Sequence, residues 1–281
     1  MKRKTGSLVF NLFVGLIFLA GLGIMLYPRI SDWWNTRNMS RNVEAYERSV
    51  QDLSEADYNA ALEKAREYNR RLRENPDPFS ERYRTEGYED TLDISGSGIM
   101  GYVTIEKLHV RLPFYHGTEE AVLQVAIGHI EGTSLPVGDP GEHAALSAHR
   151  GVPNAKLFTD LPELVTGDRF TLTVLNRKMT YEVDQILTVL PDDMEALKRE
   201  EGKDLVTLIT CTPYGINSHR LLVRGHRVEN EAEDKKGSTF SGTSAEQDAG
   251  RNYDRYVPFV AGTAVLIFGA LMFGPLFRKK K

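Results

Sequence analysis

Cysteine is almost absent from the sequence, because Cys211 is the only one in 281 residues. An intramolecular disulfide is therefore excluded, and the chain has to be stabilised by a hydrophobic core. An excess of positive charge is also missing, since 35 lysines and arginines stand against 39 aspartates and glutamates. A general nucleic-acid binder needs a basic surface to follow phosphates, so we expect no nucleic-acid partner. With 41% hydrophobic residues, the chain does not resemble an acidic disordered protein either.

Charged residues are missing from two long apolar segments, 8–27 and 256–277. Twenty helical residues at about 1.5 Å each reach roughly 30 Å, the thickness of a hydrocarbon core. A basic tail lies outside each segment, at 1–7 and 278–281, and the positive-inside rule predicts that both tails are cytoplasmic. The sequence therefore predicts a two-pass protein of the cell membrane with an extracytoplasmic domain. A cleaved signal peptide is the alternative for the first segment.

Residues 28–92 are predicted to form a helical N-terminal segment. Apolar residues recur there at three- and four-residue spacing over 40–74, which is typical of amphipathic helices. Ser54 and Asp57 have the spacing of a capping box and predict the start of a second helix. Two prolines follow residue 75 and predict its end, because proline removes a backbone donor and disfavours helix in the preceding residue.

Residues 93–230 are predicted to form a mainly β domain. Short strand-like runs alternate there with Gly, Asp and Asn turns, a pattern that favours a small, closed or nearly closed barrel with few helices. Residues 231–255 are rich in Gly, Ser, Thr and acids and predict a flexible linker. We expect strands over 99–105, 110–115, 143–147, 169–175, 178–183, 186–189, 205–210 and 221–228, and short helices over 119–127 and 194–199.

Cys211 ends the strand-like run 207–211 and is followed by a Thr-Pro-Tyr-Gly turn. A nucleophile in that position is held by the strand behind it and is open to substrate in front. Attack of a thiol on a peptide carbonyl also needs a proton donor and a group that stabilises the oxyanion. His149 ends another strand-like run, and Arg220 begins the strand that follows Cys211. The residues alone leave open which of the seven histidines is the partner, and whether the thiol is a buried structural group.

These residues resemble the sortases of Gram-positive bacteria, most closely class C, the pilus-assembly sortases. The resemblance extends over about residues 77–227 and rests on TLITC with Arg220 downstream, His-Arg-Gly at His149 and Asp-Pro-Phe at 77–79. Further segments with the same resemblance are FYHGT at 114–118, GHIEGTSLP at 128–136, AKLFTDL at 155–161 and CTPYGINSHR at 211–220.

The resemblance implies an eight-stranded sortase-type β-barrel and a cysteine transpeptidase. Cys211 is then the nucleophile, His149 the general acid and base, and Arg220 the donor to the oxyanion. The implied reaction cleaves an LPxTG-like sorting signal between Thr and Gly through a thioacyl intermediate. The acyl group is then joined to a lysine amine of another pilin subunit. The implied partners are pilins and the membrane, with no cofactor and no metal.

Three residues of the helical segment, Asp77, Pro78 and Phe79, resemble the lid of class C sortases. The resemblance implies that Asp77 pairs with Arg220 and that Phe79 covers Cys211. Without it, these residues form an ordinary turn after a helix. Two further residues near the predicted site receive weaker assignments. Thr210 either orients substrate or pairs within its strand, and His143 is expected to be structural.

Three other functions remain open at this stage. A cell-wall-anchoring sortase would use a peptidoglycan amine as the acceptor. A hydrolytic cysteine protease would release the sorting peptide into water without joining it to an amine. A non-catalytic membrane-anchored scaffold would keep its function when Cys211 is replaced by alanine.

Overall fold

The computed structural model describes residues 3–80, 85–152 and 155–229. The described chain divides into two compact units, one ending at Trp33 and one beginning at Trp34. The predicted linker at 231–255, the second apolar segment at 256–277 and the last basic tail lie outside the described residues.

The first unit contains the N-terminal part of helix α1, which runs over Arg3–Gln51. Among the described residues, α1 is the one helix that is long and apolar enough to cross a membrane, judged by length and composition. Large apolar side chains cover its surface, with Phe10 65% and Ile24 77% exposed. The helix therefore coincides with the predicted first apolar segment and continues beyond it.

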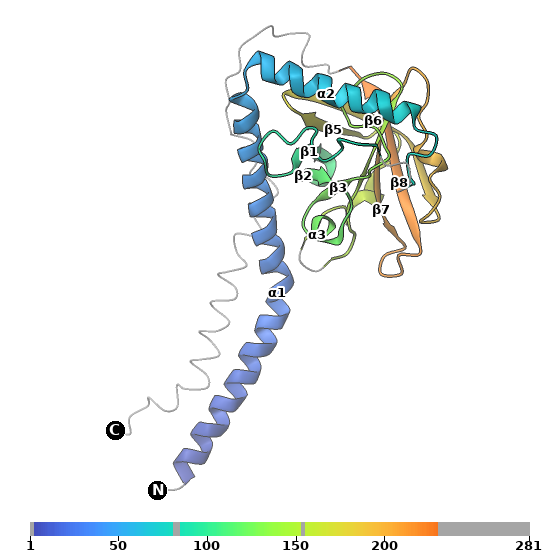
Figure 1. Ribbon diagram of the computed structural model, residues 1–281. Coiled ribbons are helices and arrows are strands. Elements are labelled where there is room, and N and C mark those ends of the chain that lie inside the picture. The colour runs from blue at the N-terminus through green and yellow to red at the C-terminus, as the bar shows by residue number, and fades with distance from the viewer. Residues whose placement is uncertain (1–2, 81–84, 153–154, 230–281) are drawn as a thin grey trace. The chain divides into compact units, whose positions relative to one another are not determined.

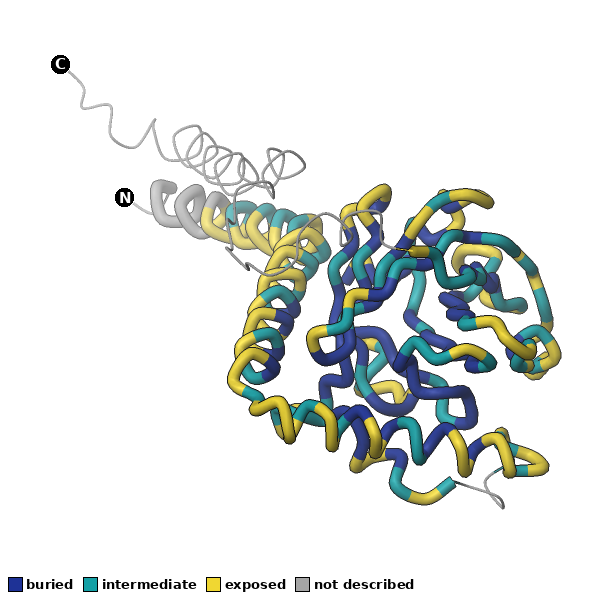
Figure 2. Tube along the Cα trace, turned by 90° about the horizontal axis from the view of Figure 1, so that it is seen from above, coloured by how far each residue is buried: buried dark blue, intermediate teal, exposed yellow. Residues whose placement is uncertain are grey.

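The second unit begins with two helices whose apolar faces are buried. The last two turns of α1 bury Val43, Tyr46 and Val50, which confirms the predicted spacing. Helix α2 spans Glu55–Glu74, and its N-cap Ser54 accepts a hydrogen bond from the Asp57 N–H, as the capping box predicts. Figure 1 shows α2 lying across one end of the barrel, and Figure 2 shows that its buried side faces inward. The buried residues of α2 are Leu62, Ala65, Tyr68, Asn69 and Leu72.

The eight described strands close into a barrel in the order β1-β2-β3-β4-β7-β8-β6-β5 (Figure 1). Two neighbouring pairs are parallel, β2 with β3 and β4 with β7, and the others are antiparallel. The predicted mainly β barrel is thus confirmed. The strands are β1 Ile99–Ile105, β2 Val110–His116, β3 Ile127–His129, β4 Glu142–Ser147, β5 Arg169–Val174, β6 Arg177–Val189, β7 Asp204–Thr212 and β8 His219–Val228. Short helices lie between them: η2 Glu106–Leu108, α3 Glu120–Leu123, η3 Leu161–Glu163 and η4 Glu195–Leu197.

The structure corrects three expected elements. The predicted helix over 119–127 is only one turn, α3, because Ile127 is buried and pairs in parallel with Phe114 as the start of β3. The predicted strands 178–183 and 186–189 are one strand, β6, with an irregular register between Val183 and Gln185. The predicted helix over 194–199 is the three-residue helix η4. Pairing with neighbouring strands decided the first two cases.

Polar anchors fasten both helices to the barrel. The Tyr46 hydroxyl donates to the Met100 carbonyl at 3.0 Å and accepts from the Leu175 N–H at 2.8 Å. On α2, the buried Asn69 side chain donates to the Leu135 carbonyl at 2.9 Å and accepts from the Leu135 N–H at 2.8 Å. These hydrogen bonds satisfy buried backbone groups, so the helices are part of the folded core.

Candidate active site

The hairpin formed by β7 and β8 brings Cys211 and Arg220 together. The two residues are direct partners in the antiparallel register. Opposite residues of such a pair project to the same side of the sheet. A tight turn closes the hairpin, since the Ile216 and Asn217 N–H groups both donate to the Pro213 carbonyl, at 3.1 and 3.0 Å. The partly exposed Cys211 therefore lies directly opposite Arg220 on the neighbouring strand.

His149 reaches the same place on the end of β4, which runs parallel to β7. Ser147 is the register partner of Ile209, and the Ala148 N–H donates to the Ile209 carbonyl at 3.1 Å. His149 and Cys211 are each two residues beyond this pair, and adjacent strands are about 4.8 Å apart. The topology thus brings His149 and Cys211 to the same end of two neighbouring strands, although 62 positions separate them in the sequence.

Side-chain alternation along β7 and β8 places Cys211 and Arg220 on the opposite face from the side chains of the barrel interior. Leu208 and Leu221 belong to the interior core, whereas Ile209 and Leu222 belong to a second, separate apolar cluster. Because side chains alternate along a strand, Cys211 and Arg220 project to the side of that second cluster. The cluster contains buried Ala145, Leu197, Ile209 and Leu222, with Ile130, Leu187, Val189, Met194 and Ala196 packed against it.

Thr210 faces the barrel interior and is only 1% exposed. Its hydroxyl donates to the Ala148 carbonyl at 2.9 Å, one residue before His149. Further along, the Phe158 N–H donates to the His149 carbonyl at 3.2 Å. In this structure Thr210 therefore joins the two strands that carry His149 and Cys211, and its hydroxyl is directed away from solvent.

A carboxylate that sequence reasoning missed lies close to the His149 imidazole. The Glu120 Oε2 atom is 3.5 Å from His149 Nε2, and the two side chains are 70% and 26% exposed. Glu120 Oε1 accepts a hydrogen bond from the Gln124 side-chain amide at 3.0 Å. The Gln124 amide, together with the charge and hydrogen bond of His149, lowers the pKa of the Glu120 carboxyl. No local motif reveals this contact, because α3 and the end of β4 are distant in sequence.

The Arg220 guanidinium makes hydrogen bonds to backbone carbonyls. Its Nη1 donates to the carbonyl oxygens of Asn217 and His219, both at 3.2 Å. Within the described ranges no ion pair joins Arg220 to Asp77, contrary to the pairing that the resemblance implied. The Asp77 N–H donates to the Asn75 side chain at 3.0 Å, a local turn contact. The guanidinium thus has neutral partners in this structure.

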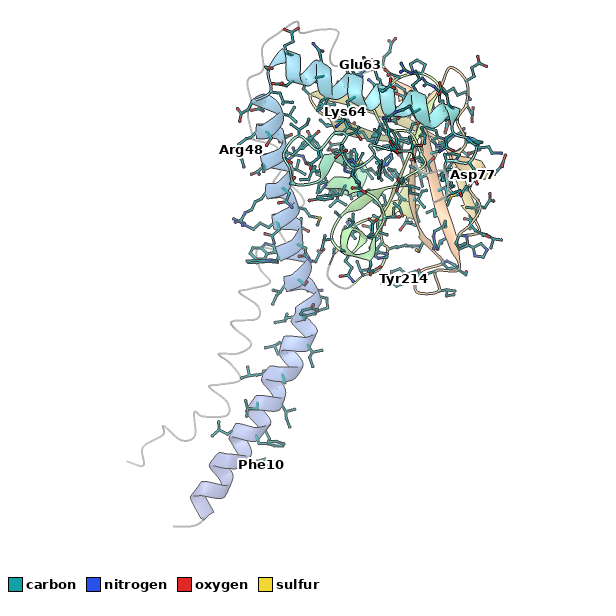
Figure 3. All side chains as sticks on the ribbon, viewed as in Figure 1. Phe10, Arg48, Glu63, Lys64, Asp77 and Tyr214 are labelled. Atoms are coloured by element: carbon teal, nitrogen blue, oxygen red, sulfur yellow. The ribbon has the colours of Figure 1, made fainter. Side chains whose placement is uncertain are left out.

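The Asp-Pro-Phe segment, residues 77–79, packs on Gly132. A Cβ atom at Gly132 would lie 2.5 Å from the Pro78 carbonyl oxygen and 2.9 Å from Phe79 Cδ1, and the Gly132 φ is +92°. Both features require glycine there. The nearby Ile130 packs against the second apolar cluster, so the segment lies at its margin. Figure 3 labels Asp77 just beyond α2 and Tyr214 in the turn between β7 and β8.

Among the other histidines, His143 and His129 are buried and structural. His143 is 1% exposed, with Nδ1 2.9 Å from the Lys198 carbonyl and Nε2 2.8 Å from the Thr207 hydroxyl, which agrees with its expected role. His129 is fully buried between the Tyr88 hydroxyl and the Ser134 carbonyl, both at 2.9 Å. Burial lowers the pKa of both, that of His129 to about 4. In the part of the chain that the structure describes, no group of three or more His, Cys, Asp or Glu could hold a metal.

Comparisons with known proteins give the same family throughout. Residues 103–228 match the model of the sortase domain. The crystal structure of sortase C1 from Streptococcus agalactiae is 47% identical, covers 68% of this chain and 100% of that chain, and has a TM-score of 0.64. The structure of Clostridium perfringens sortase C with the C-terminal cell wall sorting motif is 38% identical, covers 68% of this chain and 100% of that chain, and has a TM-score of 0.61.

A curated relative matches at lower identity. Sortase D of Bacillus subtilis (strain 168) is 29% identical over 131 residues, which are 46% of this chain and 63% of that protein. The match therefore spans less than two thirds of this relative's length.

Proposed function

The chain belongs to the sortase family of cysteine transpeptidases and is similar to its class C members, and from this we propose that it polymerises pilins. The observation that carries the proposal is the register of the sheet. Cys211 and Arg220 are opposite each other on β7 and β8, and His149 follows the parallel strand β4 by two residues. This arrangement supports a site in which a nucleophile, a proton carrier and an oxyanion donor work together.

The proposed reaction has two acyl transfers. In the first, the Cys211 thiolate attacks the threonine carbonyl of an LPxTG-like sorting signal, and Arg220 donates hydrogen bonds to the oxyanion. His149 protonates the leaving glycine amine as the C–N bond breaks, which leaves a thioacyl enzyme. In the second, a lysine amine of another pilin attacks the thioester, His149 takes its proton, and the Cys211 thiolate is released.

The partly buried margin of the second apolar cluster supports a peptide substrate with an apolar leading part. Leu187 and Val189 of this margin pair with Leu222 and Arg220, so they lie on the same face as Cys211 and Arg220. An extended peptide on this face would place its Leu-Pro portion near the cluster and its threonine carbonyl near the thiol. The similar X-ray structure of Clostridium perfringens sortase C is one with the C-terminal cell wall sorting motif, and this supports the same class of substrate.

Membrane anchoring is proposed from the apolar part of α1. Its large side chains are exposed along the helix, an arrangement that is costly in water and favourable in lipid. A second span at 256–277 is proposed from its charge-free sequence and the following basic tail. An anchored enzyme meets its membrane-tethered substrates outside the cell.

We propose that residues 77–79 act as a lid over the entry to this face. Their packing on Gly132, beside the second apolar cluster, supports that position. The contact consists of one proline carbonyl and a phenylalanine ring that is 37% exposed, so it is small enough for a bound peptide to displace. Substrate would then enter by moving a short segment between two anchored regions.

The test uses the full chain in detergent with an LPxTG peptide and a purified pilin. We expect mass spectrometry to find an acyl adduct on Cys211 and an isopeptide-linked product. Cys211→Ala is the matched control and should give neither. Thioacylation without any joining to lysine would refute pilin polymerisation, and the absence of an adduct would refute the transpeptidase itself. In a parallel reaction with a peptidoglycan-derived amine as acceptor, joining to that amine and not to the pilin would assign the enzyme to cell-wall anchoring instead.

A further inference from the structure

We propose that Glu120 binds the cationic amine that resolves the thioacyl enzyme, so that this carboxylate favours a lysine ammonium over neutral nucleophiles. The inference rests on the proposed function and concerns its second half-reaction. The juxtaposition that carries it is the 3.5 Å separation between Glu120 Oε2 and His149 Nε2. An incoming amine must come within hydrogen-bond distance of the general base, and it therefore comes close to this carboxylate.

The fold holds Glu120 at this position. Helix α3 is fixed by β3, in which Ile127 pairs with Phe114 and Gly128 pairs with Ser147 near the end of β4. Gly128 leaves room for the approach, since a Cβ there would lie 2.2 Å from the Gly117 carbonyl oxygen and 3.1 Å from Leu123 Cδ2. The close packing of α3 on β3 thus sets the distance from the carboxylate to the imidazole.

The charge state of Glu120 suits a cation. The hydrogen bond from Gln124, and after it the proximity of His149, lower the pKa of its carboxyl, so it is ionised at neutral pH. A lysine side chain is an ammonium at the same pH. An ammonium bound at His149 Nε2 would lie within about 4–6 Å of the carboxylate, a range in which opposite charges stabilise each other.

The exposure of Glu120 distinguishes between two roles for this residue, which are binding the incoming amine and positioning His149. Glu120 is 70% exposed, whereas a residue that orients a catalytic imidazole is usually held in a packed and desolvated environment. An exposed ion pair restrains its partner only weakly. Solvent access on the outer side of Glu120 also leaves one side of the carboxylate open to a second cation. The geometry therefore favours contact with the substrate over positioning of His149.

The incoming lysine is a cation and must lose two protons to become an amide. One proton is released to solvent, and the neutral amine nitrogen then attacks the thioester carbonyl. His149 takes the second proton as the C–N bond forms, and the Cys211 thiolate leaves with the electrons of the broken C–S bond. A carboxylate beside the base raises the local concentration of the ammonium and stabilises the positive charge that develops on nitrogen during attack. It makes no bond to the acyl group, so the first half-reaction needs it less.

The experiment compares two acceptors on the full chain in detergent, with an LPxTG peptide as the acyl donor. The acceptors are an Nα-acetylated lysine amide, which is cationic, and hydroxylamine, which is neutral at pH 7.5. For Glu120→Gln we expect KM for the lysine acceptor to rise about two- to fivefold. We expect KM for hydroxylamine and the rate of thioacyl formation to stay unchanged. Glu119→Gln removes the neighbouring charge and is the matched control.

The possible outcomes separate the inference from the proposed function. An equal loss with both acceptors would overturn the inference and would make Glu120 a positioning residue for His149. Unchanged KM values with both acceptors, in an enzyme that forms the thioacyl adduct, would overturn the inference alone. A chain that forms no thioacyl adduct would overturn both. An equal rise for Glu119→Gln would show a general field effect and would also overturn the assignment to Glu120.

Discussion

Replacing Asn69 on α2 should destabilise the second unit strongly, because this side chain completes the hydrogen bonding of a buried residue. Asn69 is 1% and Leu135 0% exposed. The asparagine accepts from the Leu135 N–H at 2.8 Å and donates to the Leu135 carbonyl at 2.9 Å. In Asn69→Ala the Leu135 N–H loses this partner, whereas the Leu135 carbonyl still accepts from the Val137 N–H at 2.9 Å.

The magnitude follows from this asymmetry. A buried donor without a partner costs about 1–3 kcal/mol, and the lost bond to a carbonyl that keeps another donor costs about 0.5–1.5 kcal/mol. The free energy of unfolding should therefore fall by about 2–4 kcal/mol. For a unit of this size that corresponds to a decrease in Tm of about 4–16 °C.

Thermal unfolding of the full chain in detergent, followed by circular dichroism, measures the effect. Asn59→Ala is the matched control, since Asn59 is exposed on the same helix and should change stability by less than about 0.5 kcal/mol. Asn69→Leu keeps the branched side chain of four heavy atoms but makes neither hydrogen bond, and it should resemble Asn69→Ala. If Asn69→Leu unfolds like the wild type, or Asn69→Ala like Asn59→Ala, the reasoning from hydrogen bonding is refuted.

Three further outcomes are expected. Arg220→Lys should lower kcat/KM for peptide cleavage by about 10²–10³-fold, because a lysine lacks the planar fork of donors. An unchanged labelling rate of Cys211 would show that the thiol is intact. A decrease in kcat/KM of less than about threefold would contradict the role of Arg220 as oxyanion donor. The double variant Asp77→Ala and Phe79→Ala should react faster with a thiol reagent, which reports on Cys211 alone since the chain has one cysteine; an equal rate would argue against the lid. Burial lowers the pKa of His129 from 6.5 to about 4, so the unfolded chain binds its proton first as the pH falls. The stability that neutral His129 contributes is present above about pH 6.5 and is lost as the pH falls to about 4, by up to about 3 kcal/mol. The difference in Tm between wild type and His129→Asn should therefore shrink over that range. A constant difference in Tm would contradict this prediction.

The proposed catalytic residues and the proposed lid differ in how far the sequence could predict them. Each of Cys211, His149 and Arg220 begins or ends a strand-like run, but the family resemblance was needed to select His149 among the seven histidines. The register of β7 and β8 is consistent with the predicted proximity of Cys211 and Arg220. The Asp77–Arg220 pair was expected from resemblance alone, and the structure instead has Pro78 and Phe79 on Gly132. A loop position depends on its contacts, which local sequence does not record.

Local sequence by itself determined the elements that have a strong period or a clear signal. The capping box at Ser54, the apolar spacing of the two helices and the alternation in β7 and β8 need only neighbouring residues, because hydrogen bonding and side-chain direction repeat along the chain. The charge-free apolar run in α1 can likewise be read from neighbouring residues alone. Tertiary structure alone decided that three residues from Ile127 form a strand, that Thr210 faces the interior, and that Glu120 meets His149. Each of these depends on a partner far away in sequence, and the free energy of such a contact exists only after the barrel has closed.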